Sequence, residues 1–186
     1  MKSVAVKFVV ISALVGLTSV LLHADTALLR AGEFTWNPEF STRGPLVIII
    51  SLREQPLSAY RNGIRIARSS ISSGRKGRST PAGVFTILEK EVTHYSNKYD
   101  HAPMPYMQRL TWQGIALHGG DLPGYPASHG CIRLPKTFAR LLYSITTRGT
   151  TVMVMRESAG ADPDRPPRND LVAAGGRRIT ADQGRL

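Results

Sequence analysis

Helical periodicity occurs at a single place in this chain, and this restricts the possible folds more than any other feature of the sequence. A helix is predicted over residues 135–146, because their larger apolar residues share one helical face: Phe138, Leu141, Leu142 and Ile145. Pro135 suits the first helical turn, where a missing N–H is tolerated. The other apolar runs are short and rich in β-branched residues. The sequence therefore predicts a mostly β fold with one main helix.

Several segments have the composition of β-strands. Residues 46–52 form an apolar, β-branched run that predicts a strand buried on both faces. Asn62-Gly63 separates two strand-like segments and is the dipeptide preferred in two-residue type I′ turns, so it predicts a β-hairpin. Further strands are predicted at residues 84–88, 106–112, 115–117 and 150–155, and residues 70–83, rich in Ser, Gly and Arg, predict a loop.

The N-terminus has the layout of an export signal. Lys2 and Lys7 precede an uncharged apolar run over residues 8–22, and the small residue Ala24 follows. Such a run is shorter than the ~20 residues that a spanning helix needs. This order predicts a signal peptide at residues 1–24, and an uncleaved anchor is the alternative. The mature protein is then expected in the periplasm or the cell-wall space.

Two segments flank the predicted folded domain. Residues 25–44 show no strong periodicity and predict an extended lead-in, so regular structure is expected to start at Pro45. Residues 157–186 consist largely of Gly, Ala, Asp, Arg and Pro and bury too little apolar surface to offset their ordering entropy. We predict a disordered polar tail there. The folded domain is predicted at residues 45–156.

The chain is basic, with a formal net charge of +11. The residues after Arg156 hold equal numbers of acidic and basic side chains, so the excess lies before them. A basic domain favours anionic surroundings, such as a cell-wall polymer with free carboxylates. Nucleic acid is not expected as a partner, because the signal directs export and the cations are scattered outside one cluster: Arg75, Lys76 and Arg78.

The only cysteine lies in a segment with two histidines. Residues 115–135 read IALHGGDLPGYPASHGCIRLP, in which a short apolar strand ends at His118 and a loop leads to Cys131. Exported proteins usually pair their cysteines, so an unpaired thiol points to a function, with an inert buried thiol as the alternative. Thiol catalysis needs an imidazole that takes the proton and N–H groups that bind the developing oxyanion. His118 and His129 offer the imidazole, and Gly130 lets the chain present backbone N–H groups, those of Gly130 and Cys131.

These residues resemble a known family. Residues 118–119 (His-Gly) and 128–134 (Ser-His-Gly-Cys-Ile-Arg-Leu) are similar to the signature of the L,D-transpeptidase catalytic domain family, YkuD type. Residues 79–85 (Ser-Thr-Pro-Ala-Gly-Val-Phe) resemble the Thr-Pro-x-Gly-x-Phe segment of the same family. The resemblance covers residues 45–156. It implies a β-sandwich-like fold, with the main helix after the catalytic loop.

The resemblance also implies a reaction. Cys131 is expected to form a thioester acyl-enzyme with a peptidoglycan stem peptide and to release D-alanine, after which a stem amine attacks and gives a 3-3 cross-link. His118 is the expected base, and the backbone carbonyl of Gly119 is expected to hold it in its working tautomer. No cofactor is implied. We expect a monomer that acts at the cell-wall surface in wall biogenesis and cell shape.

Two further residues near the nucleophile have open roles. His129 lies two positions before Cys131, so an extended segment would place both side chains on one face. A supporting role for His129 is favoured over direct proton transfer. Arg133 is expected either to pair with a stem-peptide carboxylate or to brace the Cys131 loop.

The remaining candidates are an aromatic pair, a serine and two histidines. Tyr106 is expected to line the acyl-donor groove, whereas Trp112 is assigned to the core, as strand aromatics usually are. Ser128 is expected to hydrogen-bond within the turn or to contact substrate. His94 and His101 lie in predicted loops and are read as ordinary polar residues.

Other functions remain open at this stage. Water as acceptor would give an L,D-carboxypeptidase, and a protein or D-amino acid acceptor would give another transferase. Papain-like hydrolases place the cysteine before the histidine, whereas here His118 precedes Cys131. A zinc site of His118, His129 and Cys131 matches no common spacing. A non-catalytic wall-binding module would contain an inert thiol, whereas an enzyme predicts a reactive, low-pKa thiolate at Cys131.

Overall fold

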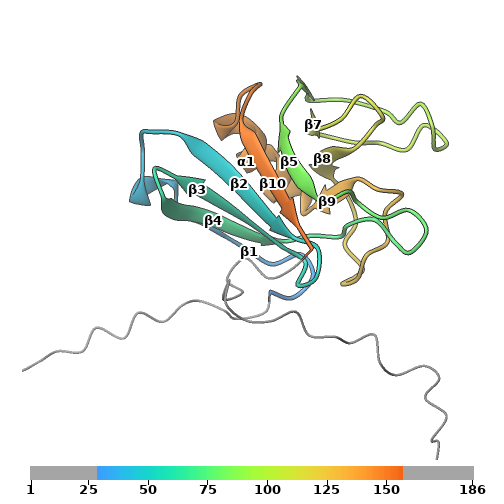
Figure 1. Cartoon of the computed structure of the whole chain (residues 1–186), viewed down its shortest axis with the longest axis horizontal. Helices are drawn as coiled ribbons and strands as arrows, with labels where there is room; N and C mark the ends of the chain where they lie inside the picture. The colour runs from blue at the N-terminus through green and yellow to red at the C-terminus, as the bar shows by residue number, and fades with distance from the viewer. Residues whose placement is uncertain (1–28, 157–186) are drawn as a thin grey trace, which may run out of the picture.

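The computed structural model describes residues 29–156, so the predicted signal peptide and polar tail lie outside the described residues. Its strands form two sheets, and one α-helix packs with them (Figure 1). No helix within residues 29–156 has the length and apolar character to span a membrane. The predicted fold class, mostly β with one main helix, is confirmed.

The larger sheet has six strands in the order β1-β4-β3-β2-β10-β5. Every neighbouring pair is antiparallel except β2 and β10, which are parallel. Figure 1 shows the last strand, β10, between β2 and β5 rather than at an edge. The bounds are β1 (Phe34–Trp36), β2 (Leu46–Ser51), β3 (Pro56–Arg61), β4 (Ile64–Ser70), β5 (Gly83–Thr86) and β10 (Thr151–Met155).

The smaller sheet carries the segment with the two histidines and the cysteine. Its order is β6-β7-β8-β9, and the pair β8 and β9 is parallel. The helix α1 (Lys136–Ile145) starts directly after β9 and packs against β8. The bounds of the strands are β6 (Glu89–Glu91), β7 (Met107–Arg109), β8 (Ala116–Gly119) and β9 (Ile132–Leu134), and a short 3-10 helix, η1 (Pro38–Phe40), follows β1.

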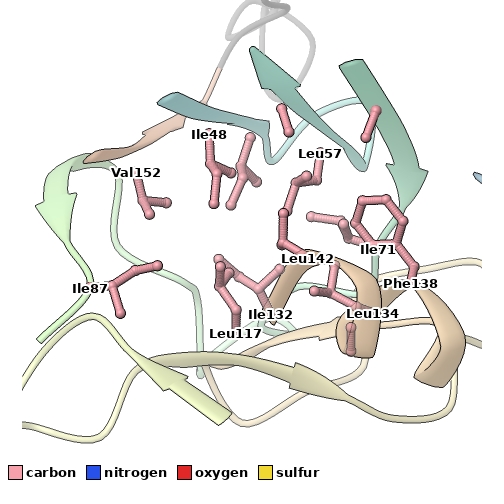
Figure 2. Close-up of a cluster of buried hydrophobic side chains, with 14 of the residues drawn as sticks. Ile48, Leu57, Ile71, Ile87, Leu117, Ile132, Leu134, Phe138, Leu142 and Val152 are labelled. Carbon is pink, nitrogen blue, oxygen red and sulfur yellow. The ribbon is translucent and has the colours of Figure 1, made fainter. Parts of the chain in front are cut away.

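One hydrophobic core joins the two sheets and α1 (Figure 2). The larger sheet contributes Ile48, Leu57 and Val152, the smaller sheet contributes Leu117, Ile132 and Leu134, and α1 contributes Phe138 and Leu142. All of these side chains are inaccessible to solvent. Burying one side chain of this size stabilises a fold by roughly 1.5–3 kcal/mol. The core therefore fixes β8 and β9 against the larger sheet.

Two local predictions are confirmed and one is partly wrong. Asn62 and Gly63 have φ values of 50° and 77°, as a type I′ turn requires, and they join β3 to β4. The predicted helix forms and buries Phe138 and Leu142 of its predicted apolar face, whereas Leu141 and Ile145 are only partly buried. The run at residues 46–52 forms β2, but burial on both faces is wrong, because Val47 and Ile49 are only partly buried.

The prediction that regular structure starts at Pro45 is wrong. β1 pairs with β4, with Phe34 opposite Ser69. The rings of Phe34 and Trp36 lie 5.5 Å and 5.9 Å from the ring of Phe138, measured between centroids. A three-residue strand is too short to show periodicity, and contacts with a helix a hundred residues away in sequence are invisible at that level. Part of the predicted lead-in therefore belongs to the folded domain.

Candidate active site

The alternation of side chains along β8 and β9 separates the core from a cleft. His118 pairs with Arg133 in the parallel register, so their side chains lie on the same face of the sheet. Leu117, Ile132 and Leu134 occupy the opposite face and are fully buried in the core. The apolar alternation of these two short strands thus directs the polar residues outward into the cleft.

The cleft has a volume of about 540 Å³ and is bordered by the β6–β7 and β8–β9 connections and by the turn between β7 and β8. Six of the predicted site residues line it: His118, Gly119, Ser128, His129, Cys131 and Arg133. A concave site with several converging polar groups is a typical place for catalysis. Gly130 and Tyr106 are not part of its lining.

His118 is buried at the base of the cleft and has a fixed tautomer. Its Nδ1 lies 2.9 Å from the carbonyl oxygen of Gly119, which can only accept, so Nδ1 carries the proton and Nε2 keeps its lone pair. Burial is the main cause that lowers the pKa of His118 to about 4, and the charges of Arg133 and His94 lower it further, against the effect of the Gly119 hydrogen bond. The imidazole is therefore neutral near pH 7 and free to accept a proton at Nε2.

Cys131 is a protonated thiol in the resting protein. Its Sγ lies 3.3 Å from the carbonyl oxygen of Gly114, to which the thiol donates. Burial raises the pKa of Cys131, although the N–H of Ala116 and the charges of Arg133, Arg109 and Lys98 act in the opposite direction. The expectation of a low-pKa thiolate is therefore wrong for the unliganded cleft. The pair rests as neutral thiol and neutral imidazole.

The N–H of Gly130 is not free to bind an oxyanion. It donates to Ser128 Oγ at 3.0 Å, and the Ser128 hydroxyl donates to the carbonyl oxygen of Cys131. The carbonyl of Gly130 accepts from Thr80 Oγ1 at 2.8 Å. The N–H of Gly130, one of the two predicted oxyanion donors, therefore closes the turn in the unliganded cleft. Ser128 performs the turn function that was predicted, and its hydroxyl is occupied.

Gly130 nevertheless has a strict conformational role. Its φ of +122° is open to glycine and strained for other residues. A Cβ at this position would lie 2.9 Å from Ile115 Cδ1. Within residues 29–156, the N–H of the next residue, Cys131, has no hydrogen-bond partner. The turn therefore leaves the N–H of the nucleophile itself as the available oxyanion donor.

His129 does not share a strand face with Cys131, because β9 begins only at Ile132 and the residues before it form a turn. Its ring stacks on Tyr99 with centroids 4.4 Å apart, and its Nε2 lies 3.0 Å from Arg75, which donates. Burial is the largest cause that lowers the pKa of His129, followed by the charge of Arg75. The contacts of His129 hold the loop before the nucleophile.

The two aromatic predictions are reversed. Tyr106 packs edge-on against Tyr143, with centroids 5.9 Å apart, and against the core, so it does not line the groove. Trp112 lies at the tip of the turn between β7 and β8, is 71% exposed and borders the cleft. The predicted strand over residues 106–112 ends at Arg109, and this places Trp112 outside the core.

Of the two roles predicted for Arg133, the structure favours a side chain that faces the cleft. Its side chain packs over Gly120, while its backbone N–H and carbonyl pair with Ser72. Across the part of the chain that the structure describes, no hydrogen bond or ion pair engages its guanidinium group. The backbone, not the side chain, braces the loop. The guanidinium group is available to a carboxylate.

The family follows from a direct match. Residues 45–154 match the model of the YkuD family, the L,D-transpeptidase catalytic domain. This chain belongs to the L,D-transpeptidase catalytic domain family. L,D-transpeptidase 1 of Mycobacterium tuberculosis (strain ATCC 25618 / H37Rv) is 28% identical over 132 residues, which make up 62% of this chain and 53% of the relative. The chain thus spans about half the length of the curated relatives it matches.

Solved L,D-transpeptidases have a similar structure. The enzyme from Stackebrandtia nassauensis is 29% identical with a TM-score of 0.56, covering 62% of this chain and 57% of the other. The L,D-transpeptidase from Xylanimonas cellulosilytica is 29% identical with a TM-score of 0.54, covering 60% and 61%. An L,D-transpeptidase solved in complex with imipenem is 26% identical with a TM-score of 0.55, covering 59% and 58%. These likenesses confirm the predicted fold.

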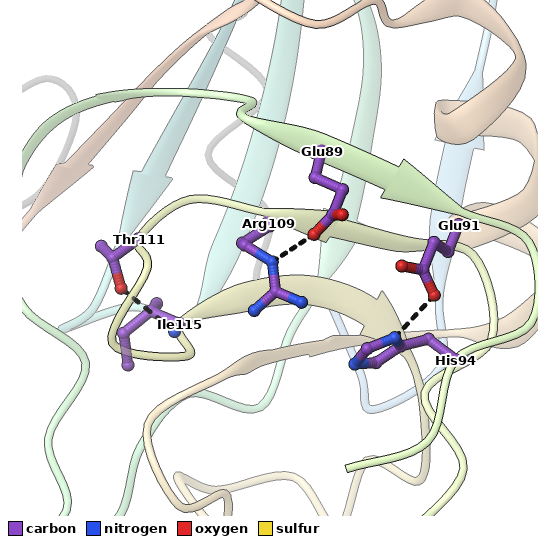
Figure 3. Close-up of polar contacts among 6 residues, drawn as sticks. All are labelled: Glu89, Glu91, His94, Arg109, Thr111 and Ile115. Carbon is purple, nitrogen blue, oxygen red and sulfur yellow. Dashed lines mark hydrogen bonds and ion pairs between the residues drawn. The ribbon is translucent and has the colours of Figure 1, made fainter. Parts of the chain in front are cut away.

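Sequence reasoning missed two pairs of basic and acidic side chains beside the L,D-transpeptidase cleft (Figure 3). His94 Nδ1 lies 2.7 Å from Glu91 Oε2, and Arg109 Nε donates to Glu89. Both basic side chains line the cleft. The alternation Glu89-Lys90-Glu91 places the two carboxylates on one face of β6, and this period of two was the available signal. The strand is only three residues long, so the signal was easily overlooked.

The alternative zinc site has no support in the geometry. Among the residues that the structure describes, no three His, Cys, Asp or Glu side chains gather closely enough to hold a metal ion. His129, one of the three ligands considered, is instead stacked on Tyr99 and accepts from Arg75.

Alkylation of the single cysteine tests the resting state of the site. Because burial raises the pKa of Cys131, iodoacetamide is expected to modify the folded protein more slowly near pH 7 than the same chain unfolded in urea. The rate should rise with pH through and beyond the ordinary thiol range. Intact-mass measurement of adduct formation across pH gives both rates. Fast, pH-independent labelling down to about pH 6 would show a thiolate–imidazolium pair instead.

Proposed function

We propose that this protein is a peptidoglycan L,D-transpeptidase that forms 3-3 cross-links between stem peptides through a Cys131 thioester. The proposal rests above all on one observation. The only thiol of the chain lies in the same cleft as a buried, neutral histidine whose Nδ1 is fixed by the Gly119 carbonyl. Membership of the L,D-transpeptidase family supports the reaction class.

Acylation follows from the resting protonation states. The Cys131 thiol attacks the carbonyl that joins the third stem residue to the terminal D-alanine, and His118 Nε2 takes the thiol proton as the S–C bond forms. The N–H of Cys131 is the available hydrogen-bond donor for the developing oxyanion. His118 then gives the proton to the leaving nitrogen, the C–N bond breaks and D-alanine departs. This sequence does not need a preformed thiolate.

Transfer completes the cycle. An amine from a second stem attacks the thioester carbonyl, His118 takes a proton from the attacking nitrogen, and the C–S bond breaks. The sulfur recovers its proton from His118, so the enzyme is restored without a cofactor. Water at the same position would give the L,D-carboxypeptidase reaction, and a D-amino acid or a protein amine would give a different transfer product.

The charge of the cleft supports a carboxylate-bearing substrate. Arg133, Lys98, Arg109 and Lys136 line it, against a single acidic lining residue, Asp121. Stem peptides carry free carboxylates, so the basic lining favours their binding. The guanidinium group of Arg133 is the best placed of these cations, because Arg133 lies two residues after Cys131 and lines the cleft. A monomer acting in the periplasm or cell-wall space remains the expectation for the whole protein.

A relative also supports an acyl-enzyme. One similar L,D-transpeptidase was solved in complex with imipenem. A carbapenem contains a strained amide that a thiol can open to a thioester, so we expect imipenem to acylate Cys131 in this protein as well. Most penicillins are expected to react weakly.

Product analysis tests the proposed function. The protein is incubated with a disaccharide-tetrapeptide, and mass spectrometry follows cross-linked dimer, tripeptide and free D-alanine. Dimer with stoichiometric D-alanine supports transpeptidation, and tripeptide alone supports a carboxypeptidase. Addition of a D-amino acid reveals exchange. If D-alanine is not released under any of these conditions, the proposed function is wrong.

A further inference from the structure

A second imidazole–carboxylate pair faces the cleft that holds Cys131 and His118. Glu91 is the last residue of β6, and His94 follows it in the connection to β7. The carboxylate can only accept, so the 2.7 Å contact places the proton of His94 on Nδ1 and leaves the lone pair on Nε2. The His94 side chain is only 15% exposed, and Figure 3 shows its ring held from one side by Glu91. The pair is therefore a pre-oriented base.

The position of His94 is fixed relative to the nucleophile. Its carbonyl accepts from the N–H of Met104 at 2.8 Å, which closes the connection on itself. The carbonyl of Pro105 in turn accepts from the N–H of Gly119 at 2.8 Å, which joins this connection to β8. His94 lies near enough to His118 to influence its pKa. Both histidines line one cleft, His94 from the connection between β6 and β7 and His118 from β8.

The transfer step releases one more proton when its acceptor is an alkyl amine, and a second base in the cleft would accept it. Such an amine has a pKa of about 10.4 and enters as an ammonium ion near pH 7. It must lose one proton before it can attack and a second proton after the C–N bond has formed. His118 handles the second proton, which it returns to the sulfur of Cys131. The first proton therefore goes either to solvent or to a base other than His118.

We propose that His94, oriented by Glu91, takes the first proton from the acceptor ammonium in the cleft. The N–H bond of the ammonium breaks, a proton is bound at His94 Nε2, and the neutral amine attacks the Cys131 thioester. His118 moves the second proton from nitrogen to sulfur, and His94 releases its proton to solvent. This inference rests on the proposed function. His94 is then a catalytic residue, and Glu91 is a positioning residue.

The surrounding charges favour this proton transfer. Arg109 from β7, Arg133 from β9 and Lys98 from the same connection all line the cleft around the pair. Positive neighbours disfavour an ammonium ion and so lower the pKa of a bound amine. The carboxylate of Glu91 stabilises the imidazolium that forms. Hydrolysis does not need His94 and Glu91, because a neutral water molecule loses only one proton when it attacks the thioester, and His118 takes that proton.

Two acceptors of different basicity test the inference. The disaccharide-tetrapeptide serves as donor in every assay, and either its own side-chain amine or hydroxylamine serves as acceptor. Hydroxylamine is largely neutral near pH 7, so it needs only His118. The variants are His94→Gln and Glu91→Gln. The matched control is His101→Asn, which removes an exposed imidazole from the same connection without touching the cleft.

The expected result is selective. His94→Gln should lower dimer formation on the order of 10²-fold, while tripeptide and hydroxamate formation stay as in the wild type, so that D-alanine release falls only by the share that accompanied the dimer. Glu91→Gln should show the same pattern with a smaller loss, and His101→Asn should show none. An equal loss for all acceptors would mean that His94 only supports the fold, and no loss would remove it from the mechanism.

The wild-type protein separates the two proposals. If it releases D-alanine and transfers the stem to hydroxylamine and water but never to an alkyl amine, the acyl-enzyme stands and the role of His94 is wrong. If it releases no D-alanine, the proposed function fails, and the role of His94 fails with it.

Discussion

Replacement of Cys131 by alanine is expected to lower D-alanine release on the order of 10⁴-fold or more, because the chain has no second thiol to take over the attack. Imipenem should add one molecule to the wild-type chain, mapped to Cys131, and none to the variant. Cys131→Ser should be almost as inactive, because an imidazole with a pKa of about 4 is a weak base for a hydroxyl group. Intact-mass measurement and product analysis give both effects.

The loss must be separated from unfolding. Cys131 is only partly buried, and its thiol makes one hydrogen bond, so the alanine variant should unfold within a few degrees of the wild type. Thermal unfolding is the control. Retained D-alanine release by a folded Cys131→Ala protein, or an imipenem adduct on Ser128, would show that the nucleophile has been assigned to the wrong residue.

Replacement of His118 by glutamine is expected to slow both acylation and transfer on the order of 10²- to 10⁴-fold, because both steps pass a proton through its Nε2. The dependence of kcat/KM on pH is a more specific test than the size of the loss. The neutral imidazole is the active form, and the pKa of His118 is lowered to about 4 in the folded protein. Wild-type kcat/KM should therefore fall only as the pH drops through about 4, with a plateau above it.

The His118→Gln profile should have a different shape. Without the base, the thiol must lose its proton to solvent, so the residual rate should rise with pH through the raised pKa of Cys131. The measurement is kcat/KM for D-alanine release across pH, with His101→Asn as the control for loss of an imidazole. A wild-type profile that falls below about pH 6.5 instead would indicate an unperturbed histidine and contradict the buried, neutral base.

Local chemistry made part of this structure predictable. Asn62-Gly63 encodes its turn through the backbone freedom of two residues, and α1 is marked by a complete apolar face. The thiol and the histidine base lie close in sequence because β8 and β9 are adjacent strands joined by one loop. The family resemblance implied the contact between His118 and the Gly119 carbonyl, and the structure shows that contact.

The remaining features depend on tertiary placement. The pKa of Cys131 is raised by burial, which residue order does not reveal. The N–H of Gly130 is taken by the Ser128 hydroxyl because of the turn geometry, and Trp112 is exposed because β7 stops three residues earlier. The contact between Glu91 and His94 needs the connection to fold back on β6. Each of these depends on where a segment stops or turns.

The place of β10 in the larger sheet has a consequence for how the chain folds. Within residues 29–156, the strand nearest the C-terminus lies between β2 and β5, and its parallel partner β2 lies about a hundred residues earlier in sequence. Contacts of such high sequence separation are formed slowly, because a long loop must close before they stabilise anything. Until residues 151–155 arrive, β2 and β5 present unpaired edges that can join other chains. Nascent or C-terminally truncated chains should therefore depend on chaperones and aggregate readily, even when they contain every residue of the cleft.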